Sequence, residues 1–136
     1  MFTPEIKNRL MIAIFSIIFL GSMNNANLGA FFPLFAQEND WINDKVLTEQ
    51  EVALIMSFPM LSQVIFSPFV SRIKAKLGTK NTILLGLTLN MLSAVGLGSL
   101  SLVKEVTIFK YGSLVCRFIQ GAGDKITQIT YYCVVT

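Results

Sequence analysis

Polar and charged side chains recur at helical spacing near the C-terminal end of an otherwise apolar chain. Arg117, Gln120 and Asp124 are three and four residues apart, so they share one face of a predicted helix with Thr127 and Gln128. A carboxylate on such a face can exchange a proton or bind a cation, because burial and a nearby cation shift its pKa in opposite directions. We therefore treat this face as the candidate ion-sensitive surface.

The spacing of the two charges limits how they interact. Seven residues of helix separate Arg117 from Asp124 by roughly 10.5 Å, which is too far for direct contact in most rotamers. Gln120 or a water molecule could bridge them, or each could pair with another helix. A purely structural role, in which the buried charges only hold the helix in register, stays open.

Long apolar segments must position these side chains. Of the 136 residues, 53% are hydrophobic and 14% are charged, whereas soluble domains carry about 25% charge. The sequence predicts an all-α membrane protein with four transmembrane helices, since about 20 apolar residues cross a bilayer. The last of them could instead lie at the membrane interface. The predicted spans are about 10–37, 52–71, 82–103 and 107–136.

Composition argues against several classes of function. The chain has no histidine, and Cys116 and Cys133 lie seventeen residues apart in an apolar segment, which is not a metal-ligand or disulfide spacing. We expect no metal, no cofactor and no enzymatic activity. The net charge is +3, but the basic residues lie at predicted helix ends rather than on one face, so a nucleic acid is not an expected partner.

The first span, 10–37, carries amides where a membrane helix is usually apolar. A basic start before an apolar run also fits a secretory signal, but the charge-free stretch is too long for one, so we expect a retained helix. Its amides should face other helices or a watery cavity, because lipid offers them no partners. Asn24 or Asn27 could line a substrate path, or the amides could form a helix-packing seam around Pro33.

A short basic segment, 72–80, separates the second span from the third. Together with the N-terminus it holds six Lys and Arg residues, against three in 38–51 and 104–110. Because Lys and Arg beside membrane spans stay cytosolic, the N-terminus and 72–80 are predicted to face the cytosol, and 38–51 the opposite side.

Local signals mark where helices begin, turn and pack. Thr48 followed by Glu51 is a capping pattern before an apolar run, which predicts a helix start. Gly78 is predicted to turn the chain within the basic segment. The third span is rich in small residues, among them Gly86 one turn before Asn90, which lets helices approach closely in lipid.

The basic segment resembles a signature of the major facilitator superfamily, roughly G-x-L-x-D-[RK]-x-G-[RK]-[RK]. The chain departs from it where Ser71 replaces the first glycine and Ala75 the acid, and one basic position is missing. Lys76, Gly78 and Lys80 keep the remaining pattern. The resemblance implies that Ser71, Lys76, Gly78 and Lys80 form a gating loop.

A second resemblance lies in the fourth span. Residues 117–123 read Arg-Phe-Ile-Gln-Gly-Ala-Gly, which looks like the superfamily's R-x-x-Q-G-x-G signature. The resemblance implies a role in proton coupling for Arg117. Within the superfamily, the chain resembles the vesicular amine and polyamine transporter branch, whose members exchange protons for cationic amines. The resemblance rests on Phe31-Phe32-Pro33, the missing acid at position 75, and Asp124.

Taken together, the resemblance implies a secondary transporter. Four helices would form most of an N-terminal six-helix half that moves a small solute by alternating access. Because no charged tail follows the fourth span, we expect the front end of a longer protein or a truncated gene model. The implied partners are the bilayer, a small solute and protons. The alternative is a four-helix membrane scaffold or assembly subunit, and the length of the parent reading frame discriminates the two.

Overall fold

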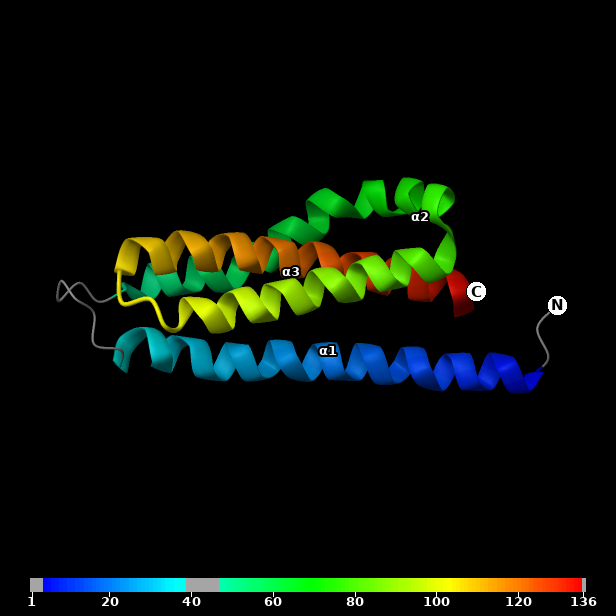
Figure 1. Ribbon diagram of the computed structural model, residues 1–136, viewed down its shortest axis with the longest axis horizontal. Coiled ribbons are helices and arrows are strands. Elements are labelled where there is room, and N and C mark those ends of the chain that lie inside the picture. The colour runs from blue at the N-terminus through cyan, green and yellow to red at the C-terminus, as the bar shows by residue number, and fades with distance from the viewer. Residues whose placement is uncertain (1–3, 39–46, 136) are drawn as a thin grey trace.

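The computed structural model describes residues 4–38 and 47–135, and every regular element in these ranges is a helix. Figure 1 shows helices α1, α2 and α3 lying roughly along one long axis. Their bounds are Pro4–Glu38, Glu49–Leu100 and Val106–Val135. An all-helical fold is what the sequence predicted.

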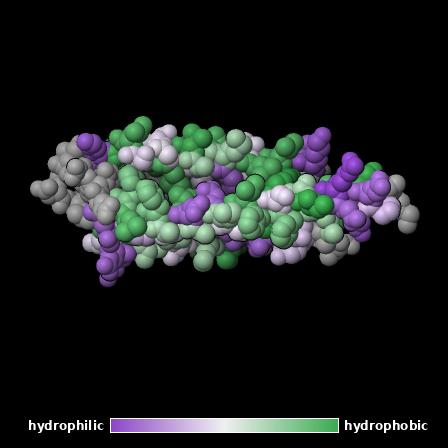
Figure 2. Space-filling model, turned by 90° about the horizontal axis from the view of Figure 1, so that it is seen from below, coloured by the Kyte–Doolittle hydropathy of each residue, from purple (hydrophilic) through white to green (hydrophobic). Residues whose placement is uncertain are grey.

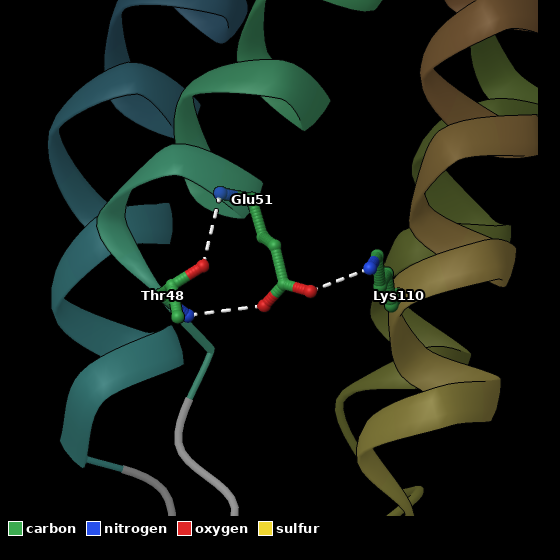
Figure 3. A network of polar contacts seen from close by, with 3 residues as sticks. All are labelled: Thr48, Glu51 and Lys110. Carbon is green, nitrogen blue, oxygen red and sulfur yellow. Dashed lines mark hydrogen bonds and ion pairs between the residues drawn. The ribbon is translucent and has the colours of Figure 1, made fainter.

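Helix α2 begins at the predicted capping box. The Thr48 side chain accepts a hydrogen bond from the Glu51 backbone N–H at 3.4 Å, and the Thr48 N–H donates to Glu51 Oε2 at 3.1 Å. Figure 3 shows the other Glu51 oxygen turned toward Lys110 of α3, with which it forms an ion pair. The Lys110 hydrogen bond, followed by the Thr48 N–H, holds the pKa of Glu51 below its usual value.

Helix α2 is two helical arms joined at Gly78. This glycine has φ 77°, a left-handed conformation that favours glycine, and the arms 49–77 and 79–100 fold back on each other there (Figure 1). The predicted turn at Gly78 is confirmed. The predicted loop at 72–80 is wrong in extent, since its basic residues lie on helical turns and only Gly78 departs from helical geometry.

Helix α3 packs against both arms of α2. A Cβ on Gly121 would overlap the backbone of Pro59 in the first arm, and one on Gly123 would come within 2.8 Å of Gly86 O in the second. Ser62 donates from the first arm to Phe118 O at 2.6 Å. A Cβ on Gly86, a small residue of the predicted third span, would in turn lie 3.0 Å from Gly123 O, so this glycine lets the backbones approach closely, as the sequence predicted.

Helix α1 is held mainly near its C-terminal end. The Phe32 ring stacks on Phe109 of α3 at 5.7 Å, and Phe35 lies 5.9 Å from the same ring. Val52 and Ile55 of α2 belong to the same buried cluster. Over its whole length, α1 has few close backbone approaches to α2 and α3.

The outer surface of the bundle is apolar. Figure 2 shows hydrophobic side chains over most of one face, with hydrophilic ones gathered at both ends and a small hydrophilic group midway. The stretches 4–37 and 49–100 are long and apolar enough to cross a membrane. At 1.5 Å per residue, the 52-residue α2 would be roughly 78 Å long if straight, so the bend at Gly78 brings each arm near bilayer length.

Candidate functional site

The carboxylate of Asp124 lies where α1, α2 and α3 meet. Its Oδ2 accepts a hydrogen bond from Asn25 Nδ2 of α1 at 3.0 Å. Its Oδ1 accepts one from Asn90 Nδ2 of α2 at 2.9 Å. Both donors are neutral amides, and no ion pair to Asp124 occurs among residues 4–38 and 47–135. The negative charge is thus solvated by dipoles rather than matched by a cation.

The guanidinium of Arg117 lies about two helical turns before Asp124 on α3, and only 2% of the residue is exposed. Its Nη1 donates to Gln120 Oε1 at 3.0 Å and its Nη2 to Met56 Sδ at 3.0 Å. The group also lies over the Phe32 ring, 5.8 Å from its centroid. Within the described ranges Arg117 Nε has no hydrogen-bond partner. The permanent positive charge of Arg117 is therefore surrounded by neutral groups: an amide, a thioether and an aromatic ring.

A chain of hydrogen bonds joins the two charged groups. Gln120 accepts from Arg117 and donates from Nε2 to Asn25 Oδ1 at 2.8 Å, and Asn25 in turn donates to Asp124. Two of the alternatives that the sequence left open are therefore observed together: Gln120 takes part in a bridge, and each charged group also contacts another helix, Asp124 through Asn25 and Asn90 and Arg117 through Met56. The bridge also needs Asn25, so it passes through α1 rather than along α3 alone.

A cavity of about 440 Å³ opens beside this chain. Among the residues that the structure describes, Asp124 is the only charged side chain in its lining. Apolar side chains line one part, and amides and hydroxyls the rest, an arrangement typical of small-molecule sites. The lining comprises Ile17, Ile18, Leu20, Gly21, Ser22, Asn24, Asn25, Gln63, Leu87, Asn90, Met91, Ala94, Gln120, Asp124, Thr127 and Gln128.

The predicted coupling residues differ in where they lie. Gln120 and Asp124 line the cavity, and Arg117 reaches it through Gln120. Asn24 is exposed and also lines the cavity, whereas Asn27 is exposed outside the lining. In the part of the chain that the structure describes, no group of three His, Cys, Asp or Glu side chains could hold a metal ion.

The predicted gating residues lie apart from the cavity. Ser71, Lys76, Gly78 and Lys80 are exposed and lie at the bend of α2 or on either side of it, at one end of the bundle (Figure 1). None of them lines the cavity.

Sequence reasoning did not single out Asn25 and Asn90, the two donors to Asp124. Asn25 was one of several amides of α1, and its neighbours Asn24 and Asn27 were preferred as path-lining residues. Asn90 had a usable signal, because it follows Gly86 by one turn and so shares the face that packs against α3.

Comparison with known proteins decides the family. The sequence model of the Major Facilitator Superfamily matches residues 14–136. The chain belongs to this superfamily. No curated protein and no solved structure matched the chain.

Major facilitator proteins are transporters that carry small solutes across membranes, and they are not enzymes. Membership and the two long apolar helices together indicate an integral membrane protein.

Proposed function

We propose that the protein is a secondary active transporter that exchanges protons for a small organic cation. The observation that carries the proposal is Asp124, a carboxylate in the cavity wall whose direct partners are two neutral amides, Asn25 and Asn90. A buried carboxylate in a membrane protein normally faces a partner charge or a water-filled path. A transported cation or a proton supplies that charge.

The lining of the cavity favours an amine with an apolar body. Ile17, Leu87 and Met91 offer apolar surface on the same cavity that Asp124 enters. Since the lining carries one negative and no positive side chain, a cation is attracted and an anion repelled. The volume of about 440 Å³ falls within the usual range of about 300–1,000 Å³ for small-molecule sites.

Exchange follows from the chemistry of a single carboxylate. Asp124 can hold a proton or pair with a cationic solute, but one unit of negative charge does not satisfy both. Binding of the solute therefore releases the proton, and protonation from the other side of the membrane releases the solute. This alternation is the coupling of an antiporter, and Arg117 acts on it through Gln120 and Asn25.

Alternating access would use the whole bundle. We propose that α1, the two arms of α2 and α3 are four membrane spans, with the bend at Gly78 and the N-terminus in the cytosol. Lys76 and Lys80 would then contact helix C-terminal carbonyls or acidic side chains of the transporter's other half on the cytosolic side. These contacts would stabilise one of the two conformations of the transporter. Rocking of one bundle against another opens a midplane site to each side in turn.

Uptake into proteoliposomes tests the proposal. The full-length protein is reconstituted with an acidic interior, and radiolabelled 1-methyl-4-phenylpyridinium is added outside. Its fixed charge stops it from following a pH gradient unaided. We expect accumulation that ends when nigericin collapses the gradient. Uptake unaffected by nigericin would contradict proton exchange, and no transport of any cation would favour the scaffold role.

A further inference from the structure

Helix α1 is docked on the bundle unevenly along its length. Its C-terminal end is fixed by the stacking of Phe32 and Phe35 on Phe109. Toward its N-terminus Ile14 is buried and Ile17 and Ile18 are half-buried, but many other large apolar side chains there are exposed. They include Leu10, Met11, Ile12, Phe15, Phe19 and Leu20. What holds the middle of α1 therefore decides where its N-terminal half lies.

Asn25 makes the polar contact at this middle position. It lies seven residues, about two turns, before Phe32. Its amide is used at both ends, since Nδ2 donates to Asp124 and Oδ1 accepts from Gln120. Both partners belong to α3, so one side chain ties the two helices together at two points.

The strength of this tie depends on the charge of Asp124. A hydrogen bond to an ionised acceptor is about twice as strong as one between neutral groups. The groups facing the carboxylate from the other elements are Asn25 of α1 and Asn90 of α2, which carry no charge. On α3 itself, Arg117 acts through Gln120, and the Lys125 ammonium donates to Gln128 at 3.3 Å. Neutralising Asp124 therefore weakens the Asn25 bond without another charge replacing it.

We propose that Asn25 is a positioning residue that couples the docking of the N-terminal half of α1 to the charge on Asp124. With the carboxylate ionised, Asn25 holds α1 against α3. When a cation or a proton occupies Asp124, that half of α1 is released to move while the aromatic contacts at Phe32 act as the pivot. The meaning of this coupling for transport rests on the proposed function, but the coupling itself does not.

Distance measurements between spin labels test the docking directly. One label is placed on a cysteine at Ser16 of α1 and the other on the native Cys133 of α3, in a Cys116→Ser background of the full-length protein. Both sites are exposed. Ser16→Cys removes only a hydrogen bond to Ile12 O of its own helix. We expect a narrow distance distribution in detergent, since Asn25 is then docked.

Variants of the tie should broaden that distribution. Asn25→Leu removes both hydrogen bonds at similar size, and Asn25→Ala does so without adding a branched side chain, in case the first variant folds poorly. Asp124→Asn removes the charge. The double variant Asn25→Leu/Asp124→Asn should be no broader than Asn25→Leu, because the two residues act as one unit. Thr88→Val, which loses only a bond to Leu84 O of its own helix, is the matched control.

The kinetics separate positioning from a merely structural role. We expect Asn25→Leu to lower the turnover of uptake roughly tenfold while changing KM much less, and Asn25→Gln to recover part of it by restoring the amide. An unchanged distance distribution in both Asn25→Leu and Asn25→Ala would overturn the inference. If no protein transports but the distributions respond as expected, the inference holds and the proposed function fails.

Discussion

Arg117 is the residue whose surroundings depart furthest from what its charge would ordinarily require. It is buried with an amide, a thioether and an aromatic ring as partners, and the only ion pair among the described residues is Glu51 with Lys110. A guanidinium suits such a place because it is planar, stacks on rings and is more weakly hydrated than an ammonium. Its role therefore depends on shape as well as charge.

Replacing Arg117 by lysine tests that dependence. Arg117→Lys keeps the charge but loses the planar fork that reaches Gln120 and Met56 together. We expect uptake to fall by about tenfold or more, the effect of losing roughly 1.4 kcal/mol, with membrane insertion unchanged. Arg9→Lys, at an exposed position of α1, is the matched control. Equal uptake rates in both variants would show that Arg117 contributes charge alone.

The residues of α3 were predictable from sequence, whereas those of α1 were not. Arg117, Gln120 and Asp124 stand out because charge in an apolar helix selects its inward face. In α1 the polar residues at 22, 24, 25 and 27 are distributed around the helix at 100° per residue. Their pattern alone does not fix the rotation of α1, and only packing places Asn25 inward.

At the scale of elements, close helix approach at the glycines of α3 positions the site. Gly121 lies against the backbone of Pro59, and Gly123 against Gly86 O and Asn90 Oδ1. The contacts of Gly123 bring the second arm of α2 near enough for Asn90 to reach Asp124 at 2.9 Å. The glycines of the R-x-x-Q-G-x-G pattern thus build the geometry in which its polar residues work.

Adding a side chain at Gly121 should separate the helices. In Gly121→Val the new Cβ overlaps the Pro59 backbone, which has little room to move. We therefore expect the free energy of unfolding to fall by about 1–3 kcal/mol or more, seen as a lower thermal midpoint in detergent. Gly98→Val is the control, because no atom lies within 4 Å of the position of its Cβ. A midpoint lowered equally in both variants would mean that helix propensity, not packing, is responsible.

The bend of α2 shows what sequence reasoning about elements gets right and what it misses. Gly78 was identifiable as the turn because its conformation, φ 77°, is one that other residues rarely adopt. The helical state of the flanking basic residues was missed. Lys and Arg are good helix formers, so a run of charge marks the end of a membrane span without ending the helix.

At the scale of the whole molecule, the two basic segments lie at the same end of the bundle (Figure 1). Figure 1 shows the start of α1 and the bend of α2 at one end of the bundle, and the turn between α2 and α3 at the other. The positive-inside rule places both basic segments on the cytosolic side, and two segments on one side must be separated by an even number of spans. The arrangement supports the orientation proposed from the sequence.

Cysteine labelling tests this orientation. In a background lacking Cys116 and Cys133, a single cysteine replaces Ala75 beside the bend or Leu102 in the opposite turn, both exposed. We expect an impermeant thiol reagent to reach Leu102→Cys in intact cells or vesicles with the external side outward. Ala75→Cys should react only after the membrane is permeabilised. The reverse pattern would invert the topology.

The central claim is that Asp124 exchanges a proton for the solute, and its neutral variant tests it most directly. We measure pH-driven uptake of 1-methyl-4-phenylpyridinium and the thermal midpoint for Asp124→Asn, with Glu105→Gln, which removes an exposed acid elsewhere, as the control. We predict that Asp124→Asn abolishes proton-driven uptake while its thermal midpoint and membrane insertion stay close to those of the control. A lower thermal midpoint, with transport whose pH dependence is unchanged, would contradict the account and leave Asp124 a structural residue.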